Sequence, residues 1–476
     1  MEEKLATVSS LERRCEELER KCSSLEDKLE STSQSTREHI DKTLKYHEML
    51  TRNQNWEYSA PVVTMDELLD DFHDEDADHI YGTSQLLKTS TVAVRRGDFP
   101  YDDGRNKKIY LEISDGYPFY DDGGINNVLS PHWSEFAAAL KQFKPAFDVL
   151  PDGCETAIIF GCVQLNQEMT QLIKEALKNT PFTGFGFMYS CYHFHGGTST
   201  IAEMMRSNKH LQSLELWHIR DMDRNDIAKL CSAIHSHPSL VEVFITSCFT
   251  NSNLGDVMLH SLLSTDELKL ERLEMPGNNL LRFQTGFNVC TLLSDYLATN
   301  PRLKKLDLNE NFLNDSHAAL IANALSSNTS LRNLCICGNS FGGVGAEALF
   351  RALSDESSLN SIADSNHSFF IEADEVQVMK ENESEVRKVN RARKIYGLLS
   401  SRNETMSNVQ YFGDIDVKLL PNLLEAVQKY SLRLRVGDDD NVKASSIVYE
   451  VMRRWDKLSP LYKSSANLKD NDTIYL

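Results

Sequence analysis

The chain has 476 residues, of which 41% are hydrophobic and 25% are charged. That length exceeds what one compact core usually supports, and the composition is that of a folded protein, so two to four structural units are expected. The net charge of −20 argues against nucleic acid or an anionic membrane as the main partner, because both attract positive charge.

Targeting signals are absent from the sequence as it stands. The opening MEEKLATVSS has no basic segment followed by an apolar one. The densest apolar run, 156–163, is far shorter than the ~20 residues that a membrane helix needs. Ten cysteines lie without a framework spacing, which is typical of reduced thiols. We therefore expect a cytoplasmic or nuclear protein with no membrane partner.

Residues 1–50 have the pattern of a coiled coil. Apolar side chains recur at alternating steps of three and four residues: Val8, Leu11, Cys15, Leu18, Cys22, Leu25 and Leu29. Glutamates occupy the e positions and basic residues the g positions, and a parallel pair brings these opposite charges together. The pattern predicts a parallel homodimer through residues 8–29. A single solvated helix is the alternative, because three heptads are barely enough for a stable pair.

Two segments precede the main body of the protein. Residues 51–90 are expected to form a flexible acidic linker, because the stretch 66–78, DELLDDFHDEDAD, holds eight carboxylates. Leu68, Leu69 and Phe72 form a candidate docking motif within it. Residues 91–151 are predicted to be an N-terminal cap over the main body, with short strands between 91 and 125 and Asp-Gly turns at 103–104 and 115–116.

A repeat begins near residue 182. Six consecutive segments fit the pattern LxxLxL: Phe182–Phe185–Phe187, Leu211–Leu214–Leu216, Leu240–Val243–Ile245, Leu270–Leu273–Met275, Leu303–Leu306–Leu308 and Leu331–Leu334–Ile336. A weaker seventh copy begins at Leu359, and successive first positions are 29, 29, 30, 33, 28 and 28 residues apart. Self-similarity at this period predicts a solenoid.

The spacing within each copy has a physical reading. Side chains alternate along a strand, so positions 4 and 6 point inward and positions 3, 5 and 7 outward. Position 9 is Asn278, Asn311 or Asn339 in three copies and Cys248 in another, and a polar group there can satisfy backbone atoms as the chain leaves the sheet. An amphipathic helix comes next in each copy. Packed helices are wider than paired strands, so the stacked units should curve with the parallel sheet inside and the helices outside.

The period of 28–29 residues, the LxxLxLxxN/C pattern and a full helix in each unit resemble the ribonuclease-inhibitor-like class of leucine-rich repeats. The resemblance covers residues 152–372 and implies an α/β solenoid. Ile219 departs from the turn position, and Asp364 occupies an inward Leu position, which indicates that the array ends there. Beyond it, residues 373–476 are predicted to form a helical C-terminal cap with three helices, Asp374–Ser400, Lys418–Tyr430 and Ser445–Leu458.

Motifs for catalysis are missing. The sequence contains no GxSxG, no HExxH, no phosphate loop and no kinase motif set. Cys191, His193 and His195 are of types that bind zinc, but no fourth ligand accompanies them. We expect no metal, no cofactor and no enzymatic activity. The resemblance leaves one alternative, a GTPase-activating protein, because one branch of this repeat class resembles the activators of Ran-type GTPases; no catalytic Asn or Arg can be placed by motif.

A binding face is predicted from the outward positions of the strands. Trp217 and Phe244 fall on neighbouring strands and are expected to form one apolar patch. The charged side chains beside them are Glu215, Glu242, Arg272, Glu274, Lys305 and Asp307. Aromatic anchors surrounded by charge are typical of an interaction hot spot. The sequence therefore predicts a scaffold that binds a protein partner on its concave face, unless a loop or the N-terminal cap covers the patch.

Overall fold

The structure is a computed structural model that describes most of the chain between residues 56 and 431. The described residues are 56–96, 101–102, 106–112, 124–143, 155–161, 166–178, 180–188, 197–219, 222–249, 253–264, 268–282, 289–373, 387–404 and 416–431, with isolated positions between 33 and 44. The predicted coiled coil at 8–29, the Cys191, His193 and His195 group and the helix predicted at Ser445–Leu458 lie outside them.

The chain divides into two compact units. The N-terminal unit comprises Met1–Gly186, Tyr192–Thr200 and Met204–Leu211, and the C-terminal unit comprises Phe187–Cys191, Ile201–Glu203 and Gln212–Leu476. The first elements in the chain are α2 (Met65–Asp71), α3 (Asp74–Arg96), β1 (Tyr101–Asp102), β2 (Asn106–Glu112), α4 (Gly124–Gln142), β3 (Glu155–Gly161), α5 (Gln167–Leu177), β4 (Gly184–Met188) and α6 (Gly197–Ser207).

The expectation of a flexible linker at 51–90 is wrong for its second half, which is helical. Helix α3 buries Ala77, Ile80, Leu87 and Val94 at helical spacing, and α3 packs on α4. The seam also contains Ser and Thr side chains, so its hydrophobic signal is weak in the sequence. The carboxylates in the first turn of α3 do not oppose the helix, because the positive end of the helix dipole favours them.

The residues expected to form a cap of short strands adopt a different arrangement. Helix α3 extends to Arg96, and only β1 and β2 are strands in the described part of 91–125. Strand β2 pairs in parallel with β3 along seven residues, and β1 pairs antiparallel with β2. These strands therefore extend the sheet of the N-terminal unit at its edge. The turns expected at 103–104 and 115–116 lie outside the described residues.

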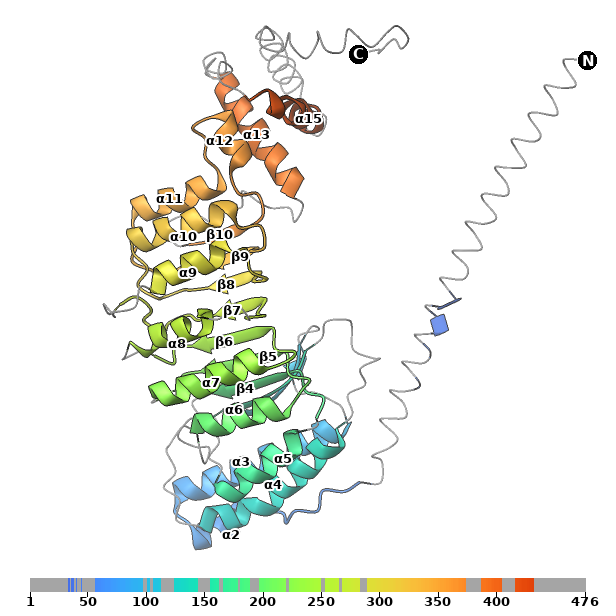
Figure 1. Ribbon diagram of the computed structural model, residues 1–476. Helices are drawn as coiled ribbons and strands as arrows, with labels where there is room; N and C mark the ends of the chain where they lie inside the picture. Colours follow the sequence, from blue (N-terminus) through green and yellow to red (C-terminus); the bar gives the residue numbers. More distant parts are fainter. Residues whose placement is uncertain are drawn as a thin grey trace, which may run out of the picture. The chain divides into compact units, whose positions relative to one another are not determined.

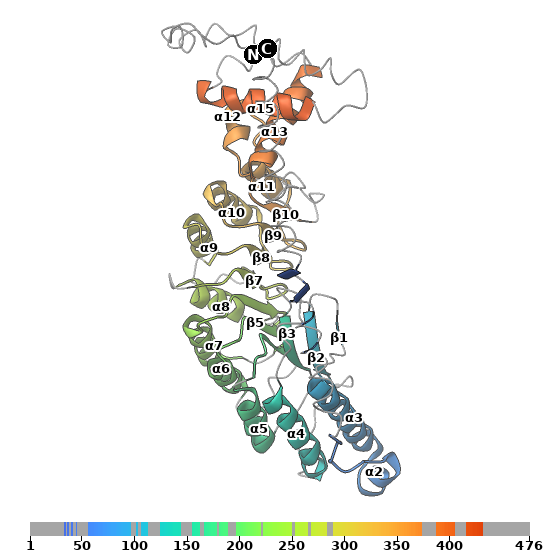
Figure 2. The same cartoon turned by 90° about the vertical axis from the view of Figure 1, so that its right-hand side faces the viewer.

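The C-terminal unit contains the main repeat array. Its elements are β5 (Ser213–Trp217), α7 (Arg224–Ser236), β6 (Glu242–Thr246), α8 (Leu254–Leu263), β7 (Arg272–Glu274), α9 (Val289–Ala298), β8 (Lys305–Asp307), α10 (Asp315–Ser327), β9 (Asn333–Cys335), α11 (Gly343–Leu353), α12 (Leu359–Asp364), β10 (Phe370–Glu372), α13 (Arg387–Glu404), η3 (Val417–Leu419) and α15 (Leu420–Ser431). Strands β5 to β10 are parallel neighbours in chain order. Helices α7 to α11 lie on one side of them (Figures 1 and 2). This confirms the predicted α/β fold class, a parallel sheet with a helix after each strand, consistent with a leucine-rich-repeat solenoid.

The inward positions of the repeat form the core between sheet and helices. Leu306 and Leu308 of β8 and its extension are at most 1% exposed, and the corresponding residues of the other copies are at most 2% exposed. Burial of each such Leu contributes roughly 1.5–3 kcal/mol relative to leaving it in water. The alternation inferred from the sequence is confirmed.

A ladder of asparagine side chains joins the repeats where the chain leaves the sheet. The Asn311 amide donates to Met275 O (2.7 Å) and Asn309 O (2.9 Å), and its oxygen accepts from Asn278 N (2.9 Å). Asn278 and Asn339 make equivalent bonds one repeat to either side. The Cys248 thiol takes the same position, donating to Leu216 O. Each rung satisfies backbone groups that would otherwise be buried without partners.

The residue before each rung turns the chain. It has a positive φ in five successive repeats: His218, Ser247, Gly277, Glu310 and Gly338. At Gly338 a Cβ would stand 2.8 Å from the Glu310 side chain, so only glycine fits this turn without a shift. The backbone donors that follow the turn reach the asparagine of the next repeat: Asn311 N and Leu313 N each donate to Asn339 Oδ1 at 3.0 Å.

The seventh copy of the repeat differs from the expectation. Leu359 begins α12, and the strand that pairs with β9 is β10, with Ile371 opposite Leu334. The helix starts there because the Ser358 hydroxyl caps it by accepting from Ser361 N at 2.9 Å. The inward position assigned to Asp364 therefore does not exist in the sheet.

The C-terminal helices pack on the end of the array. Helix α13 contacts α12 and α15, and their buried side chains form one apolar cluster: Leu359, Ile362, Ala363, Ala392, Ile395, Tyr396, Leu398, Leu399, Leu419, Leu423, Ala426 and Val427. The buried Lys394 ammonium donates to Leu353 O (2.5 Å) at the end of α11 and to Asn366 O (3.1 Å). Helix α13 starts at Arg387, and residues 374–386 of the predicted helix lie outside the described residues.

Membrane-spanning character is not found in the described helices. None of them combines the necessary length with the necessary apolar character.

We expect Asn311→Ala to lower the free energy of unfolding by about 3 kcal/mol or more, because it leaves several buried backbone groups without partners at ~1–3 kcal/mol each. Urea unfolding followed by circular dichroism measures this. Asn323→Ala, on the exposed side of α10 in the same repeat, is the matched control and should change stability little. Equal stability of the two variants would show that the ladder is not a structural necessity.

We expect a chain ended at residue 373 to aggregate or to melt at a lower temperature, because Leu359 and Ile362 lose the cluster that covers them. A chain ended at residue 431 keeps every helix of that cluster and is the control. Thermal unfolding and light scattering compare the two. A soluble 373-residue fragment with the melting temperature of the control would mean that the C-terminal helices are an independent module.

Candidate protein-binding face

The outward residues of β5 to β10 lie on the side of the sheet opposite helices α7 to α11, and we refer to this side as the helix-free face. The strand register arranges these side chains in rows that run across the strands. The middle row, which we call the acidic row, consists of Glu215, Phe244, Glu274, Asp307, Cys335 and Glu372. Four of its six members are carboxylates. The row beside it carries Glu242, Arg272 and Lys305.

The two predicted aromatic anchors occupy adjacent strands. Phe244 is opposite Glu215, and Trp217 is opposite Thr246, so the two rings are diagonal neighbours rather than directly paired. Both side chains are partly exposed. The Arg272 guanidinium lies 4.6 Å from the centre of the Phe244 ring, a cation–π contact. Two partly exposed aromatic side chains, one of them beside a cation, are therefore present on this face.

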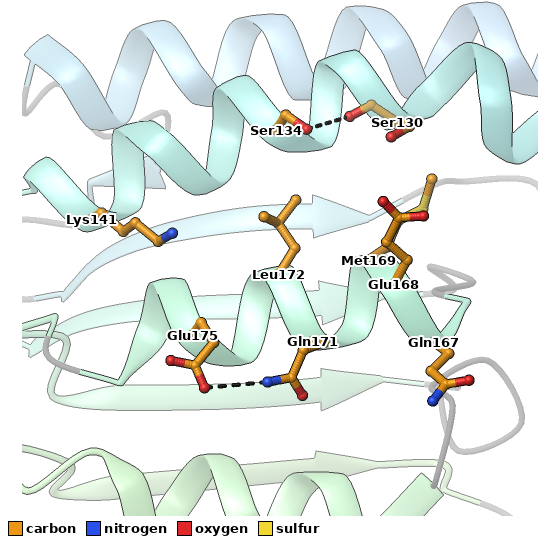
Figure 3. A pocket seen from close by; sticks show the side chains of 9 residues that line it. All are labelled: Ser130, Ser134, Lys141, Gln167, Glu168, Met169, Gln171, Leu172 and Glu175. Atoms are coloured by element: carbon orange, nitrogen blue, oxygen red, sulfur yellow. Dashed lines mark hydrogen bonds between the residues drawn. The ribbon is translucent and has the colours of Figure 1, made fainter.

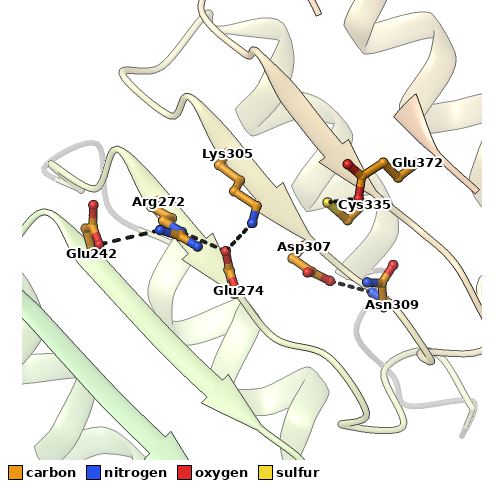
Figure 4. Close-up of polar contacts among 8 residues, drawn as sticks. All are labelled: Glu242, Arg272, Glu274, Lys305, Asp307, Asn309, Cys335 and Glu372. Carbon is orange, nitrogen blue, oxygen red and sulfur yellow. Dashed lines mark hydrogen bonds and ion pairs between the residues drawn. The ribbon is translucent and has the colours of Figure 1, made fainter. Parts of the chain in front are cut away.

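The two cations of the face share one carboxylate. Arg272 Nε is 2.6 Å from Glu274 Oε1, and Lys305 Nζ is 2.7 Å from the same oxygen (Figure 4). A second contact of Arg272, to Glu242 Oε2, is longer at 3.9 Å. Both basic side chains therefore form their shortest ion pair with Glu274.

Asp307 and Glu372 receive other partners. Asp307 Oδ1 accepts a hydrogen bond from the backbone N–H of Asn309 at 2.9 Å, and the Cys335 thiol donates to Glu372 Oε2 at 3.4 Å (Figure 4). Within the described residues, neither carboxylate forms an ion pair. Asp307 is nevertheless only 8% exposed.

Burial and like charge act together on the acidic row. Burial raises the pKa of the Asp307 carboxyl, and Glu274 and Glu372 raise it further, against the opposing effects of the Asn309 hydrogen bond and Lys305. Burial, with Asp307 and Glu372 nearby, also raises the pKa of the Cys335 thiol to about 12. That thiol is therefore neutral and adds no negative charge to the row at neutral pH.

All eight residues predicted for the site belong to this sheet face. Two of them, Glu215 at 4% exposure and Asp307 at 8%, are buried, and the other six are partly exposed. Sequence reasoning missed Glu372, because it placed the last strand at Leu359. The sequence does contain a signal for this strand, because the segment SNHSF before β10 resembles SNTSL before β9. In the structure, the side-chain amides of Asn366 and Asn328 in these segments donate to the carbonyls of Leu325 and Leu297, respectively.

A groove of about 610 Å³ lies between α4 and α5 in the N-terminal unit (Figure 3). Met169 and Leu172 provide its apolar lining. Ser134 is not a free hydroxyl, because it donates to the carbonyl of Ser130 at 2.9 Å within its own helix. Among the polar side chains that line it, the Gln171 amide donates to Glu175 Oε1 at 3.3 Å within α5.

Metal-binding clusters of three or more His, Cys, Asp or Glu are not found in the part of the chain that the structure describes. Cys191, His193 and His195 lie outside that part of the chain.

We expect Asp307→Asn to raise the melting temperature at about pH 7. A carboxyl whose pKa is raised by folding destabilises the folded state above that pKa, and this cost is lost as the pH falls through the folded value toward the unfolded one. The gain should therefore shrink as the pH is lowered to about 4. Thermal unfolding across this range measures it.

Asp355→Asn is the matched control for that measurement. Asp355 Oδ1 also accepts from the backbone N–H two residues on, at 3.0 Å, but its side chain is less buried. A pH-independent difference at Asp307, or the same gain at Asp355, would contradict the assignment of the cost to burial in the acidic row.

No family model and no curated protein sequence matches the chain. Among solved structures, it is similar to a Bacteroides fragilis protein determined by the Northeast Structural Genomics Consortium, at 14% identity and a TM-score of 0.25. The match covers 41% of this chain and 62% of that one, which is less than two thirds of its length. The function is therefore inferred from the residues of this chain alone.

Proposed function

We propose that the protein is a non-enzymatic interaction scaffold that binds a protein partner on the helix-free face of its C-terminal unit. One observation supports this above the others. Trp217 and Phe244 are partly exposed on adjacent strands, beside an ordered group of charged side chains. Exposed aromatic rings next to arginine are the residues that most often dominate the energy of protein–protein interfaces.

The geometry of the repeat favours this use of the face. Helices of 10 to 13 residues occupy the other side of the sheet. Helices of this length in every unit support assignment to the ribonuclease-inhibitor-like class of leucine-rich repeats. The strands β5 to β10 present outward side chains at a regular spacing of ~4.8 Å from strand to strand, which suits an extended contact with another protein. A coiled coil through residues 8–29, as the sequence predicts, would place two such faces in one dimer.

A photoreactive residue tests where the partner binds. Benzoylphenylalanine in place of Thr246 lies beside Trp217 on the face, and in place of Val344 it lies on α11, 73% exposed. After irradiation in the native cell, we expect one discrete cross-linked protein from position 246 and none of the same mass from position 344. Mass spectrometry identifies the product. Equal products from both positions, or none from 246, would contradict the proposal.

A double substitution tests how much the two aromatic side chains contribute to the free energy of partner binding. Trp217→Ala with Phe244→Ala should weaken binding of the identified partner by ~2 kcal/mol or more without lowering the melting temperature. Phe312→Ala is the matched control, because Phe312 is also a partly exposed ring, 39% exposed, with an arginine, Arg282, 5.1 Å from its centre. Unchanged binding in the double variant would place the partner elsewhere, and unfolding would make the two rings part of the core.

A further inference from the structure

We propose that the partner inserts a basic segment across strands β8 to β10, with lysine or arginine side chains paired to Asp307 and Glu372. This inference rests on the proposed function and specifies the chemistry of the partner at that face.

The balance of charge on the face is the first reason. Strands β7 to β10 contribute three carboxylates to the acidic row, Glu274, Asp307 and Glu372, which lie in register across the sheet. The only cations in outward positions of those strands, within the described residues, are Arg272 and Lys305, and both make their short contacts with Glu274. The region therefore carries an excess of negative charge that its own side chains do not pair.

The burial of Asp307 is the second reason. A carboxylate that is 8% exposed has lost most of its hydration, and a backbone N–H alone does not restore the stabilisation that a cation would give. Glu274 and Glu372 make this position worse for a negative charge, not better. Asp307 thus weakens the isolated fold and would be stabilised by a positive group that approaches from the helix-free side.

The neutral Cys335 separates the two carboxylates without adding charge to the row. Its thiol lies in register between Asp307 on β8 and Glu372 on β10, and it donates to Glu372. The two carboxylates are two strand spacings apart, roughly 10 Å. Alternate side chains of an extended peptide are roughly 7 Å apart on one face, and the flexible arms of Lys and Arg cover the remainder. A segment with basic residues at every second position matches this spacing.

The position of the aromatic pair extends the match. Phe244 belongs to the same row as the carboxylates, two strands away from Asp307, and Arg272 covers one side of its ring. A basic segment flanked by an apolar residue would therefore contact both parts of the row. An acidic or phosphorylated segment would meet repulsion over Asp307 and Glu372.

The test uses the full chain and a fluorescent peptide, KSKSKSKS, with ESESESES as the negative probe. Fluorescence anisotropy at low and physiological salt should show binding of the lysine peptide only. In Asp307→Asn with Glu372→Gln the affinity should fall by roughly tenfold or more, because each charged pair is removed while the side-chain shapes are kept.

A second double variant separates the site from the overall negative charge. Asp295→Asn with Glu347→Gln removes the same two charges from exposed positions on α9 and α11 and should bind the peptide within about twofold of the unmodified chain. Equal weakening in both double variants would overturn the proposal, because the peptide would then be responding to net charge. Absence of binding to the unmodified chain would also overturn it.

The cross-link at position 246 distinguishes failure of this inference from failure of the proposed function. If Asp307→Asn with Glu372→Gln retains the full cross-linked product, the partner binds the face without a basic segment, and only this inference is wrong. If the chain with benzoylphenylalanine at position 246 and no other substitution gives no product, the proposed function is wrong, while the peptide titration still reports whether the acidic row binds cations.

Discussion

The hydrogen bonds of Asn278, Asn311 and Asn339 are the constraint on which the repeat array depends. Each asparagine stands where the chain leaves the sheet, at the same position of its repeat. Its side-chain amide donates to backbone carbonyls of its own repeat and of the one before. Its oxygen accepts from the loop of the preceding repeat. The backbone at this point is buried and cannot be satisfied by water, so the side chain must supply the missing partners. A second set has the same role at the other end of the repeat, where the side-chain amides of Asn328 and Asn366 donate to the carbonyls of Leu297 and Leu325 near the ends of α9 and α10.

These hydrogen bonds hold both ends of each repeat in place. Along the strands between them, successive side chains point to opposite sides, so the sheet has two faces of different composition. Inward leucines bury apolar surface against the helices, and this burial stabilises the array. Outward residues lie on the other face of the sheet and take no part in that core. The array therefore holds a row of carboxylates at fixed spacing, which a flexible chain could not do, because mutual repulsion would separate them.

Asp307 lowers the stability of the free protein, and we propose that it contributes to binding of the partner. Its neighbour Glu274 interacts with both available cations, while Asp307 stays buried without one. Residues that weaken the isolated fold are characteristic of surfaces that a ligand completes. The same reasoning separates Asp307 from Asp315, a carboxylate that accepts from Gly342 N and Gly345 N in the next repeat and thereby supports the stacking of α10 and α11.

The sequence by itself determined the repeat, its register and the face on which the candidate residues lie. Strand alternation has a period of two and is local, so Glu215, Trp217, Phe244 and their neighbours could be assigned to the outward side without coordinates. Tertiary structure alone decided three other matters. Helix α3 packs against α4 through a seam in which Ser and Thr side chains are buried among Ile80, Leu87 and Val94, so the helical pattern is weak and the acidic composition of the segment outweighed it. The last strand is β10, because Ser358 caps a helix where a strand was expected. The pairing of Arg272 and Lys305 with the same oxygen of Glu274, which leaves Asp307 and Glu372 without a cation, depends on the register between strands and on side-chain conformations, and these are settled only when the sheet is assembled.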